Sequence, residues 1–166
     1  LDAIHGGKRR GALSGGKTLE VNIPAGIVDG QHIRLKNQGE PGIGGGPAGD
    51  ALVEVKIEPH AFFQRDGLDI HVELPVTLSE AVLGGRIAAP TVDGMVNVTV
   101  PKGANTGTRL RLKGKGIKHG KGASRGDQII KLKVVLPDAP DSQLAAFVEK
   151  WRPKGDDNVR EKFRLT

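Results

Sequence analysis

One segment of this chain occurs twice, and the repeat constrains the fold more than any other feature of the sequence. The segment VNIPAGIVDGQHIRLKNQG (21–39) returns 77 positions later as VTVPKGANTGTRLRLKGKG (98–116), with eight of the nineteen residues identical. The same offset pairs Gly49-Asp50 with Gly126-Asp127. Self-similarity at a fixed spacing indicates a tandem duplication. We therefore expect two halves with the same fold.

Each copy carries the alternation of a small β unit. Before the shared proline, every second residue is apolar: Leu19, Val21 and Ile23 in the first copy, and Val96, Val98 and Val100 in the second. This period is typical of a strand with one buried face, and the glycines that follow mark a turn into a second alternating run. The sequence thus predicts a mainly β protein. We expect two tandem similar β-sandwich-like domains over residues 1–66 and 67–138, named here the first and second repeats.

The two copies differ at their beginnings. AIHGG (3–7) corresponds to AVLGG (81–85), and both read as the end of a short helix with exit glycines. In the second copy the extended segment LDIHVELPV (68–76) precedes this helix, whereas the first copy has no counterpart. The sequence therefore predicts that the first repeat lacks its opening strand and that the chain is a fragment. Between the copies, PHAFFQRDG (59–67) predicts a bend held by phenylalanine packing and an Arg65–Asp66 contact.

Composition excludes several classes of site. The chain has no cysteine, which excludes disulfides, thiolate zinc sites and thiol nucleophiles within it. Its five histidines show no ligand spacing, so we expect no metal and no cofactor. No catalytic constellation is visible, so we expect a protein that is not an enzyme. Because no apolar run is long enough to span a membrane, we expect no membrane partner and a cytoplasmic location.

A basic segment without a single acidic residue extends over residues 109–125. Its candidate anion contacts, in a chain of net charge +6, are Arg109, Arg111, Lys113, Lys115, Lys118 and Lys121. Such a segment attracts phosphate, DNA or an acidic peptide. It is also typical of a solvated loop that keeps an edge strand soluble. Both interpretations stay open, and DNA binding is the alternative function.

GALSGGKT (11–18) matches the phosphate-loop pattern GxxxxGK[ST]. That motif needs a helix whose N-terminus faces the phosphates. The residues that follow Lys17 alternate with a period of two and end at Pro24, which predicts a strand instead. We therefore interpret the motif as a hairpin turn with Gly15-Gly16 at its tip, and nucleotide binding is a distant third hypothesis.

The C-terminal part of the chain predicts one short helix within residues 139–152, followed by a polar tail over residues 153–166. Its apolar stripe consists of Leu144, Phe147, Val148 and Trp151, at positions i, i+3, i+4 and i+7. A helix of about ten residues is not stable alone, so the stripe must dock. It either covers the second repeat or meets its twin in a homodimer.

Several motifs occur here in an order that is typical of one protein family. They are VNIPAGIVDGQHIRLKNQGEPG (21–42), HAFFQRDGLDI (60–70), PVTLSEAVLGG (75–85), APTVDG (89–94), VPKGANTGTRLRLKGKG (100–116) and RGDQII (125–130). With these motifs the chain resembles the C-terminal substrate-binding region of DnaJ-type (J-domain) co-chaperones. It is most similar to the class without the zinc-binding insertion, because Ser14-Gly15-Gly16 stands in its place, and to the bacterial curved-DNA-binding branch.

The resemblance implies a function and a set of site residues. Members of this family bind unfolded or extended apolar client polypeptides, deliver them to a DnaK-type chaperone and dimerise through the C-terminal helix. Carried over by position, the client-binding groove of the first repeat would be lined by Gly11, Leu13, Val53 and Val55. Gly11 stands where the family has a large apolar residue. Leu144, Phe147, Val148 and Trp151 would form the dimer contact.

Overall fold

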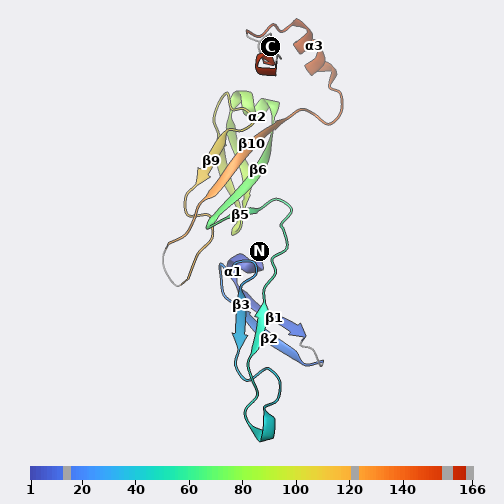
Figure 1. Ribbon diagram of the computed structural model, residues 1–166. Helices are drawn as coiled ribbons and strands as arrows, with labels where there is room; N and C mark the ends of the chain where they lie inside the picture. Colours follow the sequence, from blue (N-terminus) through green and yellow to red (C-terminus); the bar gives the residue numbers. More distant parts are fainter. Residues whose placement is uncertain (13–15, 121–123, 155–158, 164–166) are drawn as a thin grey trace. The chain divides into compact units, whose positions relative to one another are not determined.

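A computed structural model describes residues 1–12, 16–120, 124–154 and 159–163 of the chain. The chain divides into two compact units, Leu1–Val134 and Val135–Thr166, which are described separately. Ten strands and a few short helical segments make up the described elements (Figure 1). The prediction of a mainly β chain with tandem β domains and a short C-terminal helix is confirmed.

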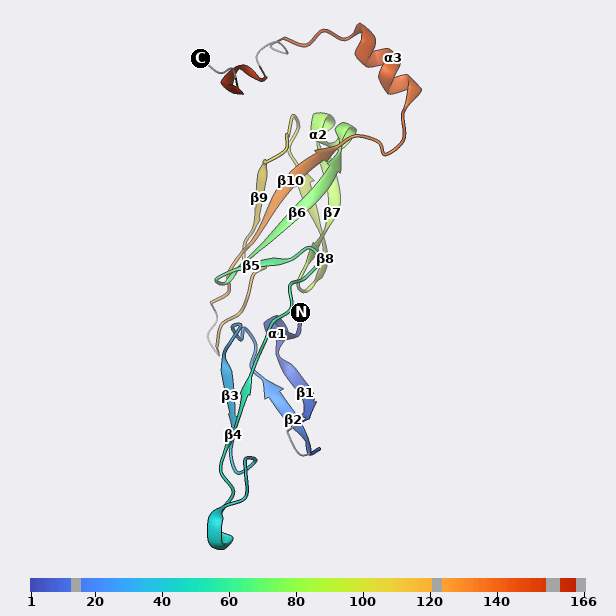
Figure 2. The same ribbon diagram turned by 45° about the vertical axis from the view of Figure 1, so that its right-hand side comes forward.

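The first repeat is built from a helical turn and two small antiparallel sheets. Its elements are α1 (Asp2–His5), β1 (Gly7–Ala12), β2 (Thr18–Ile23), β3 (His32–Leu35), η1 (Ile43–Gly45) and β4 (Ala51–Glu54). Strand β1 pairs with β2 from Gly7 opposite Ile23 to Ala12 opposite Thr18. Strand β3 pairs with β4. Figure 2 shows the two pairs beside each other.

The second repeat is a two-layer β-sandwich. Its elements are β5 (Gln64–Asp66), β6 (Asp69–Thr77), α2 (Leu78–Leu83), β7 (Gly85–Thr91), β8 (Gly94–Val100), β9 (Arg109–Leu112) and β10 (Gln128–Val135). One sheet has the strand order β5-β6-β10-β9, and β7 and β8 form the other. Between them lies a core of buried residues: Leu74, Val76, Ala81, Ala89, Val98, Val100, Ile130 and Leu132.

The duplication is visible in the backbone. Gly6 and Gly84, which end α1 and α2, have φ angles of 72° and 70°. A Cβ atom would lie 2.6 Å from the carbonyl oxygen of Ile23 at Gly6, and 2.8 Å from that of Val100 at Gly84. Both positions therefore need glycine, because the left-handed backbone and the close neighbouring strand each disfavour a side chain.

The junction between the repeats differs in detail from the prediction. Phe62 and Phe63 pack against each other and against His60, with ring centroids 4.5 to 4.8 Å apart. The expected Arg65–Asp66 contact is wrong. Arg65 donates instead to the carbonyl oxygens of Ile27, Gly26 and Gly67, and Asp66 pairs with His71 at 3.4 Å. Sequence adjacency suggested the pair, but neighbouring side chains on a strand point to opposite faces.

The phosphate-loop motif lies in a β-hairpin. Residues 13–15 are outside the described part of the chain, but β1 before them and β2 after them pair directly. Lys17 is followed by a strand, and its Nζ donates to the side chain of Gln38. In the part of the motif that the structure describes, a strand and not a helix follows Lys17, so the helix N-terminus that phosphate binding requires is not found there.

The second unit contains the helix α3 (Ser142–Lys150) and the short segment η3 (Glu161–Phe163). Asp141 caps α3, since its Oδ1 accepts a hydrogen bond of 2.9 Å from the backbone N–H of Leu144. Trp151 is the first residue after the helix. In the described residues, no helix has the length and apolar character needed to cross a membrane.

Candidate functional site

A cleft of about 260 Å³ opens between the two sheets of the first repeat. All four strands contribute to its walls, and its lining is apolar except for one carboxylate. The lining residues are Gly11, Ala12, Leu19, Val21, Leu35, Leu52, Val53 and Glu54. This open apolar cleft can hold side chains of a ligand, and among its described lining residues only Glu54 is ionisable.

The sheet beside the cleft has free edges. Among the described residues, β1 and β2 pair only with each other, so each keeps one edge without a ladder partner. Every residue of β1 is exposed. Unpaired backbone N–H and C=O groups on such an edge are a template for an additional strand. The first repeat thus combines a sequence-independent pairing edge with an adjacent apolar cleft.

The second repeat shows what closes the same region. The counterparts of Gly11, Val21 and Val53 are Ala89, Val98 and Ile130, which are 0%, 5% and 0% exposed inside the sandwich core. In the first repeat Val53 is only half-buried, and its neighbour Leu52 is 68% exposed. The difference has a structural cause, because strand β6 supplies Leu74 and Val76 to the second core. No described strand does so in the first repeat.

The structure brings together some of the predicted groove residues. Gly11 and Val53 line the cleft from opposite sheets. Val55 follows β4 and lines a different cavity of about 420 Å³ together with Ile23 and Ile57. Leu13 lies outside the described residues. The prediction missed three leucines that line the cleft, namely Leu19, Leu35 and Leu52. Their alternation signals a strand, but this signal is the same for a closed core and an open cleft.

Gly11 leaves part of the cleft wall unfilled. An added Cβ atom would meet no heavy atom within 4 Å, and the φ angle of Gly11 is not positive. A larger side chain therefore fits there without backbone strain.

We predict that Gly11→Leu strengthens binding of an extended apolar peptide roughly threefold to tenfold, because the leucine adds apolar area to the wall. Fluorescence anisotropy with a labelled peptide measures the change. Gly11→Asn is the matched control, since it makes a similar backbone change without adding apolar surface. Equal affinities of the leucine and asparagine variants would show that this wall does not contact the peptide.

The basic segment contains one arginine that is engaged in a repeated structural motif. Arg111 donates to Oδ2 of Asp127 at 2.6 Å, and the backbone N–H of Gly114 donates to Oδ1 at 2.8 Å. These hydrogen bonds, first that of Gly114 and then that of Arg111, lower the pKa of the Asp127 carboxyl. The first repeat has the same arrangement around Asp50, whose pKa is lowered by Asn37 and Arg34. Both aspartates therefore fix the turn between two paired strands.

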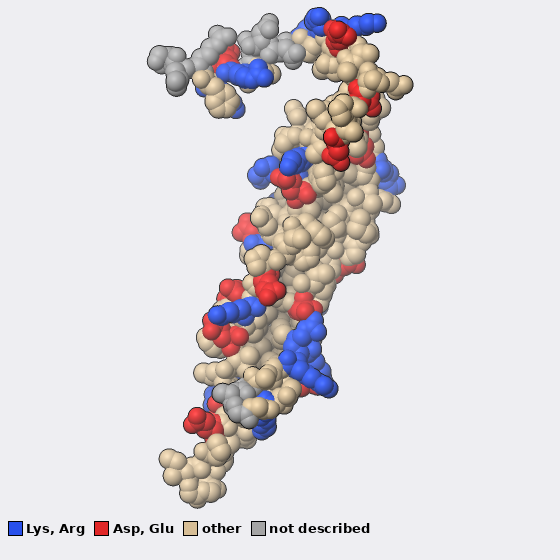
Figure 3. Space-filling model, turned by 90° about the vertical axis from the view of Figure 1, so that its right-hand side faces the viewer, with Lys and Arg blue, Asp and Glu red and all other residues tan. Residues whose placement is uncertain are grey.

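The other basic residues that were predicted to contact an anion do not surround a single acidic residue. In the described part of the chain, Arg109, Lys113, Lys115 and Lys118 form no ion pair, and Lys121 lies outside it. Arg109 stands directly opposite Lys131 in the β9–β10 ladder. Figure 3 shows that basic and acidic side chains are interspersed on one face of the molecule.

The predicted stripe of α3 is apolar and exposed. Phe147, Val148 and Trp151 are 62%, 46% and 52% exposed, and no residue of α3 is buried. The rings of Phe147 and Trp151 stack with centroids 6.2 Å apart. Leu144, the fourth residue of the stripe, is partly buried. A contiguous apolar surface of this kind on a short helix is typical of a protein contact.

Comparisons with known proteins give this arrangement a context. Residues 2–137 match the family model of the DnaJ C terminal domain. The chain is 54% identical over 121 residues to the chaperone protein DnaJ of Neisseria meningitidis, an alignment that covers 73% of this chain and 32% of the relative. It is 42% identical over 145 residues to the chaperone protein DnaJ of Geobacillus kaustophilus, which covers 87% of this chain and 38% of the relative.

A third relative, the chaperone protein DnaJ of Bacillus licheniformis, is 49% identical over 161 residues, with 84% of this chain and 43% of the relative covered. The chain therefore spans about a third to two fifths of the length of these relatives. The family model covers most of the chain, including both repeats and the cleft. The chain belongs to the family of the DnaJ C-terminal domain.

Proposed function

We propose that this chain is the client-binding part of a DnaJ-type co-chaperone, and that the cleft of the first repeat holds side chains of an unfolded polypeptide. The observation that carries the proposal is the difference between the two repeats. The same strands enclose a complete core in the second repeat, whereas the first leaves apolar residues around Val53 open beside a free sheet edge.

The chemistry of the site suits clients of many sequences. Backbone hydrogen bonds to a free edge recognise an extended chain without reading its side chains, and the cleft adds affinity for apolar ones. Burying about 100 Å² of apolar client surface contributes roughly 2.5 kcal/mol at ~25 cal/mol/Å², before ordering costs are subtracted. A single site of this kind binds weakly, which suits a protein that releases its client.

The test is a titration of the chain with a labelled extended apolar peptide, at low and at high salt. We predict that Val53→Asp weakens binding at least tenfold, roughly the loss expected when a charge is placed in an apolar contact. Asn22→Asp is the matched control, because it adds the same charge on the exposed side of β2. Circular dichroism confirms that both variants fold.

Two outcomes would contradict the proposal. Unchanged affinity of Val53→Asp would remove Val53 from the binding site. Binding that disappears at high salt would point to the basic segment 109–125, because phosphate-type contacts lose affinity steeply with salt whereas apolar contacts do not. DNA binding by Arg109, Lys113, Lys115 and Lys118 is the alternative, favoured by the lack of ion pairs to these residues in the described chain. A duplex DNA titration run in parallel separates the two functions.

The family also suggests partners. The relatives are named chaperones, and we propose that the complete protein delivers its clients to a DnaK-type chaperone in the cytoplasm. The chain contains no cysteine, which supports its assignment to the class without the zinc-binding insertion. We further propose a homodimer held by the stripe of Leu144, Phe147, Val148 and Trp151, and this proposal is tested separately below.

A further inference from the structure

The second repeat has a hollow of its own on its four-stranded sheet, with a volume of about 560 Å³. Its walls come from the junction before β5 and from strands β5, β6, β10 and β9, which form that sheet (Figure 2). Phe62, Glu73, Arg109 and Lys131 are among the residues that line it. We call this hollow the outer groove. Its described lining shares no residue with the cleft of the first repeat.

Two basic side chains of the outer groove stand opposite each other. Arg109 of β9 and Lys131 of β10 are direct partners in the antiparallel ladder. Their strand neighbours Leu110, Ile130 and Leu132 face the sandwich core, so strand alternation directs Arg109 and Lys131 to the outer face of the sheet. Like charges that are directly opposite in a ladder repel and weaken it. An anion held between the two side chains would remove this repulsion.

The described part of the chain supplies no such anion. None of the ion pairs between described residues includes Arg109 or Lys131. Glu73 lines the same groove, but its Oε1 lies 3.7 Å from Nζ of Lys133. The positive charge of the opposed pair is therefore open to a ligand.

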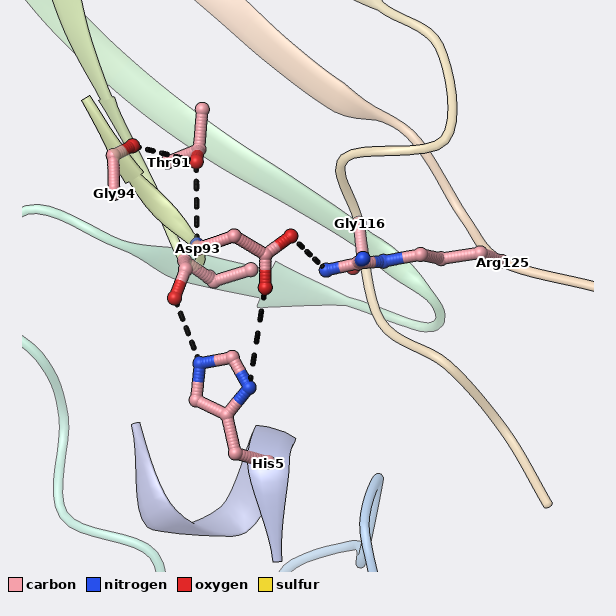
Figure 4. Close-up of polar contacts among 7 residues, drawn as sticks. His5, Thr91, Asp93, Gly94, Gly116 and Arg125 are labelled. Carbon is pink, nitrogen blue, oxygen red and sulfur yellow. Dashed lines mark hydrogen bonds and ion pairs between the residues drawn. The ribbon is translucent and has the colours of Figure 1, made fainter. Parts of the chain in front are cut away.

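Two arginines elsewhere in the second repeat are each held by a carboxylate. Figure 4 shows Arg125, which donates to Asp93 at 2.5 Å and to the carbonyl oxygen of Gly116. Arg111 donates to Asp127 at 2.6 Å. These arginines are part of the folded framework. The two opposed cations of the outer groove have no comparable structural role.

The first repeat does not have this charge conflict at the corresponding place. The counterparts of Arg109 and Lys131, 77 positions earlier, are His32 and Glu54, which are direct partners in the β3–β4 ladder. A histidine opposite a glutamate gives no like-charge repulsion. The duplicated fold therefore does not require two cations here. The pair is specific to the repeat that has the outer groove.

We propose that the outer groove binds a carboxylate of an acidic, partly apolar peptide segment, and that Arg109 and Lys131 hold this carboxylate between them. Hydrogen bonds from cationic donors to a carboxylate are stronger than those between neutral groups. Phe62, which lines the groove and is 49% exposed, offers a contact to an apolar side chain next to the carboxylate. The groove is thus a second peptide site, with a different preference from that of the apolar cleft.

The lining favours a peptide over a nucleic acid. Duplex binding depends on several phosphate contacts along the surface. The outer groove offers one pair of cations, and it also contains the carboxylate of Glu73, which repels phosphates. A hollow of about 560 Å³ accepts a few side chains of a peptide, whereas a duplex lies across such a hollow without entering it.

The test uses two labelled peptides that differ in one group. The first has a single glutamate between two leucines, and the second has glutamine in its place. Both have blocked termini and a neutral dye, so the glutamate is the only charge that differs. Fluorescence anisotropy with the whole chain at low salt measures both affinities. We expect the glutamate peptide to bind roughly threefold to tenfold more tightly, the effect of one partly exposed charged contact.

Lys131→Glu assigns this preference to the outer groove. The substitution converts the repulsive pair into an attractive one, so it should abolish the preference for glutamate while raising the midpoint of thermal unfolding by about 1–3 °C. Arg109→Gln should also abolish the preference. Lys102→Glu is the matched control, because it makes the same charge change at an exposed residue of the second repeat outside the groove. It should keep the preference.

Three results would overturn the proposal. They are equal affinities of the two peptides for the parent chain, a preference that survives in Lys131→Glu, and displacement of the glutamate peptide by an equal concentration of duplex DNA. The Val53→Asp variant separates this proposal from that of the cleft. It should keep the preference for glutamate, because Val53 does not line the outer groove.

Discussion

Removing the same two methyl groups is expected to destabilise the second repeat by about 2–3 kcal/mol but the first by less than about 1 kcal/mol. The first comparison is Ile130→Ala against Ile130→Val, and the second is Val53→Ala against the parent chain. Each comparison removes the same two methyl groups. Ile130 is 0% exposed in the sandwich core, so its truncation leaves a cavity. Val53 lines an open cleft, where solvent and neighbouring side chains occupy the space.

Urea denaturation followed by circular dichroism measures both changes in the free energy of unfolding. The Ile130→Val variant is the reference for the first step, and the parent chain is the reference for the second. If the urea curve shows more than one transition, each variant is compared by the transition that it shifts. Equal costs would show that Val53 is as enclosed as its counterpart. The cleft would then lose its role as the candidate binding site.

Much of the fold follows from the sequence because the duplication shows the same pattern of strands and turns twice. The alternation around Val21 and Val98 predicted the strands β2 and β8, and the shared glycines predicted the ends of α1 and α2. These features are local, so periodicity and backbone sterics are enough to find them. The replacement of a phosphate loop by a hairpin was predictable for the same reason, since the residues after Lys17 alternate with a period of two.

The functional surfaces were less predictable because they depend on partners that are far apart in the sequence. His5 contacts a backbone carbonyl 87 residues away in the sequence, and a carbonyl acceptor has no sequence signal. The basic segment has no acid within it, yet Arg111 and Arg125 pair with Asp127 and Asp93 outside it. Which apolar residues line the cleft depends on the strand that would cover them. Neither the ion pairs nor the lining of the cleft can be predicted from a local sequence pattern.

Phe147→Asp is expected to convert a dimer of this chain into a monomer, and sedimentation velocity would measure the change in mass. The stripe of α3 is exposed in the single chain, and a nine-residue helix needs a partner surface to be stable. A carboxylate at Phe147 would have to be buried in the contact, which costs more than such a short interface contributes. Trp151→Ala or truncation after Asp138 should have the same result.

Ala146→Asp is the matched control, because it adds the same charge on the opposite face of α3 and should leave the dimer intact.

Dimerisation also bears on client binding, since two weak clefts on one particle raise the effective concentration for a client that reaches both. Loss of the dimer should therefore lower the apparent affinity for a long client roughly 10²-fold, while the affinity for a short peptide stays the same. An unchanged mass for Phe147→Asp would instead assign the stripe to a contact within its own chain. Equal losses for long and short clients would show that each cleft depends on the dimer for its own shape.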